Sequence, residues 1–423
     1  MISVIKSSES DKFIKELKQR SGSVDAKVTE SVTQIIKEVA ENGDEALRKF
    51  TKQFDNIDID TFEVDKSLLR KGYENSKISS ALEKAAENIR RFHEKQKQNG
   101  YIQTGADGIV MGQRVIPIEK VGIYVPGGTA AYPSSVLMNA IPAKVAGVDE
   151  IIMITPPGRG VSDDILAAAY IAGVDRLFMV GGAHGVAALA YGTEQIPKVD
   201  KIVGPGNIFV ATAKKLLYGI VDIDMIAGPS EILIIADDKA PAASVAADLM
   251  SQAEHDVLSS SILLCLSEQK ANEVISELER QVKTLSREEI IRKSLKDHGV
   301  IMICENVEEE AAISNKIAPE HLELCVENPF ELLNSVRNAG SVFMGYSSPE
   351  PLGDYYAGPN HVLPTSGTAR FFSALSVDSF IKKSSYLYYS EIALNKAADD
   401  VISIAEAEGL TAHANSIKVR TGK

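Results

Sequence analysis

The sequence predicts an α/β protein built on parallel sheets, with a helical N-terminal part and a small C-terminal segment. From about Val115 onwards, apolar strand-like runs alternate with helix-like runs of roughly 10–15 residues, which is typical of parallel sheets with crossover helices. The strand-like runs are almost continuously apolar, as in sheets that helices cover on both faces. With 423 residues, the chain is too long for one ordinary core.

Helical periodicity dominates the first hundred residues. One predicted helix begins near Thr29 and Ser31 and stops at Asn42 and Gly43, because this dipeptide is a typical helix end. A second predicted helix covers about residues 79–98. Its His93 stands among charged residues, so we interpret it as a surface side chain.

The alternating region follows in order. The predicted strands are 120–125, 150–157, 176–180, 201–203, 230–237 and 261–267. The predicted helices are 136–148, 163–174, 181–193, 210–220 and 242–255. The acidic run 308–310 is interpreted as the solvated start of a helix. After about Val377 the alternation ends, and the remaining residues are predicted to form helices that end in a polar, strand-like tail.

Composition narrows the classes of function. The formal charge of −13 and the pI near 5.2 argue against nucleic acid or an anionic membrane surface as a partner. The N-terminus resembles no signal peptide, and no apolar run approaches the roughly 18 residues of a membrane span. Cys265, Cys304 and Cys325 stand in apolar runs, which indicates reduced core thiols. We therefore expect a cytoplasmic protein.

Three glycine-rich loops follow predicted strands: YVPGGTAAYPSS from Tyr124, VGGAHG from Val180 and VGPGN from Val203. Small residues at these places let backbone N–H groups approach a phosphate. None of the loops has the complete G-x-G-x-x-G pattern, so tight turns remain an alternative. A nucleotide would lie at the carboxyl ends of these strands.

Polar residues in unusual contexts suggest a second site. Gln252 and His255 stand three apart on a predicted helix, so both project from one face, as metal ligands or as solvent-facing groups. Pro319 suits the first turn of a helix, which would place Glu320 and His321 at the helix start.

Two further pairs stand later in the chain. Asp354 and His361 share a loop rich in glycine and proline, where polar groups favour function over core packing. Glu408 and His413 lie close to the C-terminus, where exposure alone would explain them. Nitrogen and oxygen donors of this kind could hold zinc, and manganese or cobalt equally.

Taken together, these segments resemble the histidinol dehydrogenase family over nearly the whole chain. The resemblance rests on eight stretches: NGDEALRKFTKQFD, GIYVPGGTAAYPSSVLMNAIPAKVAGV, KVDKIVGPGNIFV, DMIAGPSEILIIAD, SQAEHD, APEHLEL, GDYYAGPNHVLPT and LTAH. It implies two incomplete Rossmann-like parallel-sheet domains with small terminal segments, in an intertwined homodimer.

The domain boundaries expected from this resemblance are as follows. Residues 1–24 form an N-terminal helical segment. Residues 25–121 together with 233–377 form the first Rossmann-like domain, with the metal and substrate residues. Residues 122–232 form the second, with the NAD loops. Residues 378–423 form a C-terminal segment that is exchanged with the partner subunit.

The resemblance also implies site residues. The zinc ligands would be Gln252, His255 and Asp354, with His413 from the other subunit, one zinc per subunit. Substrate contacts would involve Ser230, His321 and His361, with Glu408 from the other subunit and the four zinc ligands. NAD contacts would fall on Tyr124, His184 and Asn207. The family usually has glutamine where this chain has His184.

The implied reaction is the oxidation of L-histidinol through L-histidinaldehyde to L-histidine with two NAD, the last step of histidine biosynthesis. His321 would accept the alcohol proton, and Glu320 would activate water for the second oxidation. This route needs no thiol nucleophile.

Three rival functions remain open. The nearest is a zinc- and NAD-dependent dehydrogenase of the same fold that acts on another polar alcohol or diol. His361, Glu408 and Ser230 argue against it. A non-catalytic metal- or nucleotide-binding protein would not need the Glu320–His321 pair. A phosphosugar isomerase-like site would leave the metal set unexplained.

Overall fold

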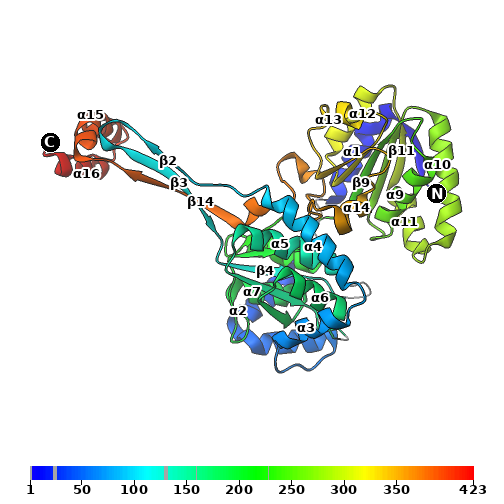
Figure 1. The fold of residues 1–423 in the computed structure, drawn as a ribbon, viewed down its shortest axis with the longest axis horizontal. Coiled ribbons are helices and arrows are strands. Elements are labelled where there is room, and N and C mark those ends of the chain that lie inside the picture. Colours follow the sequence, from blue (N-terminus) through cyan, green and yellow to red (C-terminus); the bar gives the residue numbers. More distant parts are fainter. Residues whose placement is uncertain (1, 22–25, 128–131, 159, 227) are drawn as a thin grey trace. The chain divides into compact units, whose positions relative to one another are not determined.

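The computed structural model describes residues 2–21, 26–127, 132–158, 160–226 and 228–423. The chain divides into two compact units. The first contains Met1–Gln96 and Ile118–Phe380, and the second contains Lys97–Pro117 and Ile381–Lys423. Figure 1 shows both units with their elements labelled. Within the described ranges, no helix combines the length and the apolar character needed to cross a bilayer.

A five-stranded parallel sheet forms one half of the first unit. Its strand order is β6-β5-β4-β7-β8. The strands are β4 (Lys120–Tyr124), β5 (Glu150–Thr155), β6 (Arg176–Met179), β7 (Lys201–Val203) and β8 (Asp222–Ile223). Counted along the chain this is the order 3-2-1-4-5, which a dinucleotide-binding fold extends by one further strand. The prediction of an incomplete Rossmann-like sheet is therefore confirmed for this half.

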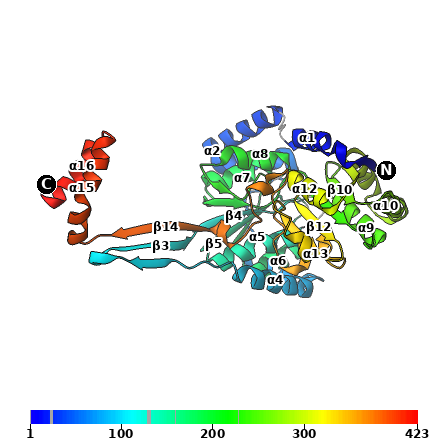
Figure 2. The ribbon, with the colours of Figure 1, turned by 90° about the horizontal axis from the view of Figure 1, so that it is seen from above.

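Helices cover both faces of this sheet. One face packs on α4 (Ser79–Glu94), α5 (Pro133–Ala146) and α6 (Asp163–Ala172), with α3 (Lys66–Asn75) against α6. The other face packs on α2 (Ala26–Asp55), α7 (Gly182–Tyr191) and α8 (Ile208–Leu217). Figure 2 shows the two groups of helices on opposite sides of β4 and β5. This double cover explains why the strands are apolar at nearly every position.

The packing of α2, α3 and α4 differs from the expected grouping of residues 25–121 with 233–377. Val39 and Leu47 of α2 share a core with Ile152 of the five-stranded sheet. Ile89 of α4 packs in the core on the opposite face of that sheet. The periodicity of these helices revealed an apolar face but not its partner, so the domain edges stay a prediction.

A six-stranded parallel sheet forms the other half of the first unit, in the order β1-β11-β10-β9-β12-β13. The strands are β1 (Ser3–Lys6), β9 (Glu231–Ala236), β10 (Ser260–Cys265), β11 (Gly299–Ile303), β12 (His321–Cys325) and β13 (Ser341–Met344). Strands β9 to β13 again have the order 3-2-1-4-5, and β1 pairs with β11 at the edge. The fold class is thus confirmed for both halves.

This second sheet is also covered on both faces. One face packs on α9 (Ala242–Ala253), α10 (Glu268–Gln281) and α11 (Glu288–His298). The other packs on α1 (Ser10–Ser21), α12 (Val307–Ile317) and α13 (Pro329–Leu333). The three cysteines are free and buried in these cores, as predicted.

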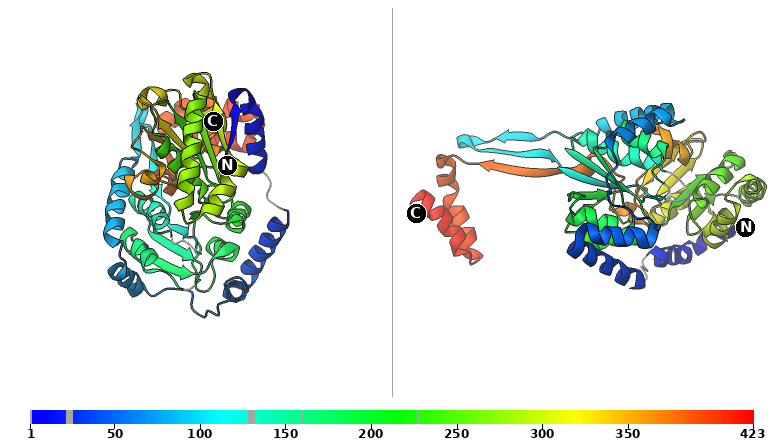
Figure 3. Two further views of the ribbon diagram at one scale, coloured as in Figure 1. Left: turned by 90° about the vertical axis from the view of Figure 1, so that its right-hand side faces the viewer. Right: turned by 90° about the horizontal axis from the view of Figure 1, so that it is seen from below.

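The second unit is an antiparallel ribbon with two helices. Strand β3 (Val110–Pro117) lies between β2 (Tyr101–Thr104) and β14 (Ile381–Tyr388). Helices α15 (Glu391–Ala407) and α16 (Thr411–Thr421) follow, and the right-hand view of Figure 3 shows them after the strands. The predicted tail was wrong in its order, because the strand precedes the helices. It pairs with a strand much earlier in the chain, where Lys383 lies opposite Val115, 268 residues before it.

Four local predictions need correction or qualification. α2 continues to Asp55, but it is interrupted at Gly43 (φ +50°), where the helix was expected to stop. His93 is fully buried rather than on the surface, because α4 packs against the segment that carries Asn360. The acidic run 308–310 does form the first turn of α12, as predicted, but only Glu308 is exposed, and Glu310 is buried rather than solvated. His321 begins strand β12, so the helix expected after Pro319 does not form.

Candidate active site

A cleft of about 270 Å³ lies in the first unit, between residues of both sheets. From the six-stranded half come residues at the amino ends of β9 and β12. From the five-stranded half comes the glycine loop after β7. Six side chains predicted from sequence line this cleft: Ser230, His255, Glu320, His321, Asp354 and His361. The structure therefore brings together residues that are up to 131 positions apart.

Strand pairing fixes the central pair, Glu320 and His321. The Nδ1 of His321 contacts the backbone carbonyl of Glu231 at 3.0 Å. The Oε2 of Glu320 accepts a hydrogen bond from the backbone N–H of Glu231 at 2.9 Å. Glu231 begins β9, the strand that pairs with β12. With Nδ1 held by this carbonyl, the Nε2 of His321 has no hydrogen-bond partner among the described residues. This nitrogen is therefore available to accept or donate a proton in the cleft.

Burial and neighbouring charges determine the pKa values of Glu320 and His321. Burial raises the pKa of Glu320 to about 7. Burial alone would lower the pKa of His321, but the carboxylates of Glu320, Asp354 and Glu350 outweigh it and raise the pKa to about 10. Glu320 lies 3.6 Å from the ring, measured from Oε2 to Nδ1. In the metal-free protein, the imidazole is therefore the protonated member of the pair at neutral pH.

Carboxylates surround the free nitrogen of His321. Its Nε2 lies 3.8 Å from Oδ1 of Asp354 and 4.0 Å from Oε1 of Glu350. Asp354 belongs to a π-helical turn, Gly353–Ala357, that follows the short helix α14 (Glu350–Leu352). Although burial opposes it, the interaction of the carboxylate with the nearby imidazoles of His321 and His361 holds the pKa of Asp354 well below its usual range. Asp354 is therefore ready as an anionic ligand.

His361 closes the same side of the cleft. Its Nδ1 contacts the carbonyl oxygen of Asp354 at 3.1 Å, and its Nε2 lies 3.5 Å from Oγ of Ser135. Burial lowers the pKa of this imidazole. A neutral ring held at Nδ1 can offer its other nitrogen to a substrate.

Gln252 and His255 lie at the end of α9. Gln252 is completely buried, and its Nε2 contacts Nδ1 of His255 at 3.3 Å. Its Oε1 is buried and has no hydrogen-bond partner in the part of the chain that the structure describes. A buried carbonyl oxygen without a partner is unfavourable unless another group, such as a cation, satisfies it. Together with the anionic Asp354, this donor set fits a divalent metal of the zinc type.

On the opposite side of the cleft, a buried ion pair holds the glycine loop after β7. Lys214 of α8 pairs with Asp224, and both side chains are almost fully buried. Lys214 donates to the carbonyl of Gly204 at 2.9 Å, and the N–H of Gly204 donates to Asp224 at 2.8 Å. Gly204 has φ +108°, and a Cβ there would lie 2.2 Å from the carbonyl oxygen of Tyr124. The loop therefore requires glycine and a fixed path.

The three predicted NAD residues lie around this loop, in different environments. Asn207 is exposed and caps α8, because its side chain accepts from the N–H groups of Phe209 and Val210. Tyr124 is buried and its hydroxyl accepts from the N–H of Gly182 at 3.2 Å.

His184 differs from both. It is 1% exposed, and its ring lies 5.8 Å from the rings of Phe50 and Phe54 in α2. Neither ring nitrogen has a hydrogen-bond partner among the described residues, and burial lowers the pKa to about 4. To contact a cofactor, this side chain would have to leave its apolar surroundings.

Glu408 and His413 belong to the second unit. Glu408 caps the C-terminal end of α15, and His413 lies in the first turn of α16. Both residues are exposed.

Several site residues were missed from the sequence. Glu350 is a buried carboxylate beside His321, Glu231 holds His321 and Glu320 through its backbone, and Lys214 and Asp224 line the cleft as an ion pair. Glu350 stands between two prolines, and the sequence around it is typical of a surface loop. Lys214 gave a usable signal, because a lysine in the apolar run VATAKKLL needs a buried partner.

Two Rossmann-like sheets border one cleft, with a glycine loop on one side and a buried histidine–carboxylate pair on the other. This arrangement defines the chain as an α/β enzyme of the dinucleotide-dependent dehydrogenase class.

Comparison with known proteins gives the family. Residues 18–421 match the family model described as histidinol dehydrogenase. The histidinol dehydrogenase of Clostridium acetobutylicum is 58% identical over 418 residues, which cover 97% of this chain and 96% of that protein. That of Caldanaerobacter subterraneus is 56% identical over 410 residues, covering 96% and 95%. The crystal structure of histidinol dehydrogenase from Elizabethkingia anophelis matches with a TM-score of 0.93 at 36% identity, covering 99% and 98%.

The chain therefore belongs to the histidinol dehydrogenase family and is an NAD-dependent oxidoreductase.

Proposed function

We propose that this protein oxidises L-histidinol through L-histidinaldehyde to L-histidine, with two NAD and one zinc per subunit, as the last step of histidine biosynthesis in the cytoplasm. The observation that carries the proposal is the cleft itself. Glu320, His321, Asp354, His361, His255 and Ser230 line one cavity together with the loop at Gly204. A cavity of about 270 Å³ suits a small polar substrate.

His321 is the base of the first oxidation. Its Nε2 faces the cleft and accepts the hydroxyl proton, while the carbinol carbon gives a hydride to the first NAD. The products of this step are the aldehyde, NADH and one proton. The carbonyl of Glu231 fixes the ring so that only this nitrogen is available.

Glu320 serves the second oxidation. With a pKa raised to about 7, it can take a proton from water near neutral pH. Glu320 takes this proton as the water oxygen adds to the aldehyde and returns it to the resulting alkoxide, which gives the hydrate. His321 then accepts a hydroxyl proton of the hydrate while its carbon gives a hydride to the second NAD, and the products are the carboxylic acid, NADH and one proton. Neither step uses a thiol, which agrees with the burial of Cys265, Cys304 and Cys325.

Gln252, His255 and Asp354, with the partner's His413, would hold the zinc. When bound, zinc supplies positive charge that orients the substrate's amine and imidazole and offsets the carboxylate that keeps His321 protonated. The buried, unpartnered Oε1 of Gln252 and the anionic Asp354 support this assignment. Tyr124, His184 and Asn207 would meet the NAD at the carboxyl ends of the five-stranded sheet.

A homodimer would complete the site, with Glu408 and His413 of each tail serving the other subunit. The second unit supports this, because its own apolar core is small and its main cluster of buried residues consists of Ile402, Ala405 and Ala414. Its large apolar side chains are instead exposed, among them Ile102, Leu387, Ile392, Ile404 and Val419. Such a surface is typical of a segment that packs against another chain.

The test is NADH formation from L-histidinol, followed by absorbance. We expect two NADH per histidinol, no activity after chelation, and recovery on addition of zinc. A yield of one NADH, or none from a protein that binds zinc and NAD, would contradict the proposal and favour another polar alcohol as substrate.

A further inference from the structure

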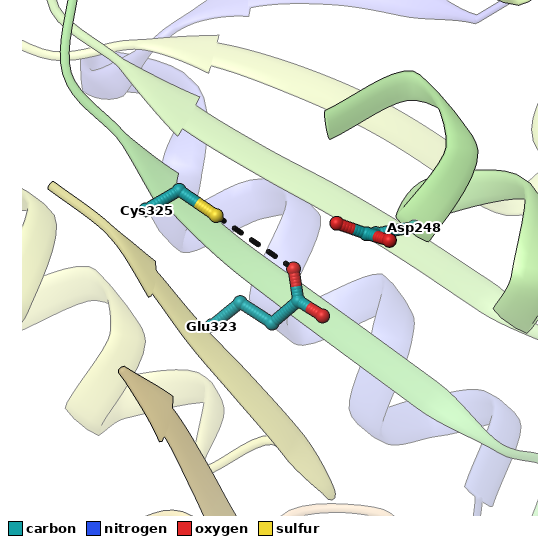
Figure 4. Close-up of side chains that lie close together, drawn as sticks. All are labelled: Asp248, Glu323 and Cys325. Carbon is teal, nitrogen blue, oxygen red and sulfur yellow. Dashed lines mark hydrogen bonds between the residues drawn. The ribbon is translucent and has the colours of Figure 1, made fainter. Parts of the chain in front are cut away.

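A second cluster of titratable side chains lies deeper in the first unit, beyond the residues used above. It contains Asp248 of α9 with Glu323 and Cys325 of β12, whose ligand atoms all lie within 4.8 Å of one another. Figure 4 shows the two carboxyl groups and the thiol pointing toward each other between the helix and the strand. Glu323 is 1% exposed and Asp248 is 9% exposed.

The two carboxyl groups act as one acid. Burial raises the pKa of Glu323 well above its usual value and that of Asp248 to about 6, and the two side chains share a hydrogen bond. Two buried carboxylates in contact repel each other, so one of them keeps its proton and donates to the other. The thiol of Cys325 lies 3.8 Å from Oε2 of Glu323 and adds a weak third contact.

Glu323 also holds a backbone group of the active site. Its Oε1 accepts from the N–H of Glu350 at 2.7 Å. Glu350 begins the short helix that leads to Asp354. The side chain of Glu350 returns to α9, where its Oε2 accepts from Oγ of Ser251 at 3.1 Å.

These contacts join the three elements that carry the proposed zinc and catalytic residues. Asp248 lies one turn before Gln252 on α9. Glu323 stands two residues after His321 on the same face of β12. The segment that starts at Glu350 carries Asp354. The acid pair therefore lies where the helix, the strand and the turn meet.

We propose that Glu323, together with Asp248, is a positioning residue of the zinc site, which holds the end of α9 against the segment from Glu350 to Asp354 so that the metal donors converge. The inference rests on the zinc site proposed above and deepens it. Neither residue of the pair lines the cleft. It acts through the backbone of Glu350 and through α9.

The chemistry of the pair allows a sharp test. Gln at position 323 keeps an oxygen for the N–H of Glu350 and offers an amide N–H to Asp248, so it can replace the shared proton. Met at this position keeps much of the volume but makes neither bond. Residues that support metal ligands contribute roughly 10- to 100-fold to metal affinity.

The experiment measures zinc affinity of the full chain by competition with a chromophoric chelator, without reference to activity. We expect Glu323→Met to weaken zinc binding about tenfold or more and Glu323→Gln to stay close to the wild-type affinity. Glu310→Met is the matched control, since it removes a buried carboxyl from the opposite face of the same sheet. We expect it to leave zinc affinity unchanged.

Circular dichroism and the melting temperature establish that each variant is folded. A folded Glu323→Met protein with wild-type zinc affinity would overturn the inference, as would a Glu323→Gln protein as weak as Glu323→Met. If Glu323→Met does not fold, Asp248→Leu against Asp248→Asn gives the same comparison, with loss expected only for leucine. Failure of the wild-type protein to bind zinc would instead contradict the proposed function.

Discussion

The two parallel sheets share the strand order 3-2-1-4-5, yet they present opposite ends to the cleft. The five-stranded sheet contributes the loop at the carboxyl end of β7, where backbone groups of Gly204 are fixed by Lys214 and Asp224. The six-stranded sheet contributes the amino ends of β9 and β12, where Glu231 and His321 begin their strands. One sheet therefore supplies a glycine loop that a buried ion pair holds in place, and the other supplies the histidine–glutamate pair.

The six-stranded sheet also has a crevice at its carboxyl end. It is lined by Asp237, Glu308, Glu327 and Glu331, with a volume of about 460 Å³. Carboxylates at this place repel phosphate, so this crevice is unfavourable for a dinucleotide. Two sheets with the same strand order thus border the cleft with different ends, and their side-chain charges differ at the carboxyl ends.

The largest effect on activity should come from a substitution in the six-stranded half, which carries His321. His321→Asn removes the nitrogen that accepts the proton, and we expect turnover to fall roughly 10²- to 10⁴-fold in both oxidations. Steady-state rates with histidinol and with the aldehyde measure the two half-reactions. Near-normal turnover in either would remove His321 from the base role in that step.

Substitutions in the five-stranded half should mainly lower the stability of the protein. Lys214→Met leaves Asp224 as an uncompensated buried charge, which we expect to lower the free energy of unfolding by about 3–5 kcal/mol. The double variant Lys214→Met/Asp224→Leu should recover most of this loss. Urea unfolding measures both.

A matched control is Lys201→Met, because its partner Asp222 is 48% exposed and stays hydrated. We expect this variant to lose much less stability than Lys214→Met. Equal losses in the two single variants would mean that burial of the pair is not what makes the glycine loop sensitive.

His184 gives a pH test in the same half. Its pKa is about 4 in the folded protein, against 6.5 for a free imidazole. As pH falls from about 6.5 to about 4, the unfolded chain takes up a proton that the folded protein refuses, so stability is lost in this window, by up to about 3 kcal/mol. Denaturant unfolding from pH 7 to pH 4 should show a shallower loss for His184→Gln. Parallel curves for the two proteins would contradict this origin of the acid sensitivity.

The smallest effects concern the KM for NAD, which we compare between variants of the two halves. Glu308→Gln and Glu327→Gln remove charge from the acidic crevice, and we expect no change in KM for NAD. Asn207→Ala, at the start of α8, should raise that KM severalfold because it disturbs the loop and its helix cap. A change in KM from the crevice variants would place cofactor binding in both halves.

Sequence patterns predicted most of the alternating region, because apolar strands and helix ends are local signals. They also found six lining residues, chiefly through the resemblance. The helix expected after Pro319 was wrong because the pairing of β12 with β9 and β13 outweighs a local helix-start signal. His93 and Glu310 were misplaced for a similar reason. Charged neighbours along the chain say nothing of the element that packs over a residue.

Side-chain partners were the least predictable part of the site. The contact between Glu323 and the N–H of Glu350 joins residues 27 positions apart, and that between Glu320 and Glu231 joins residues 89 apart. Neither carboxylate shows in the sequence that it will be buried, because each stands in a pattern that also suits a half-exposed strand. Only the assembled sheet shows that these carboxylates are buried and which backbone N–H groups they accept from.

The pairing of β1 with β11 bears on how the chain is made. Ser3 to Lys6 lie beside Val300 to Ile303, so β1 has no partner until about 300 further residues have been synthesised. The five-stranded sheet and its helices, in contrast, come from one continuous stretch between α2 and β8. That stretch can fold while synthesis continues. The edge position of β1 then lets the N-terminal strand join last, without opening a sheet that has already formed.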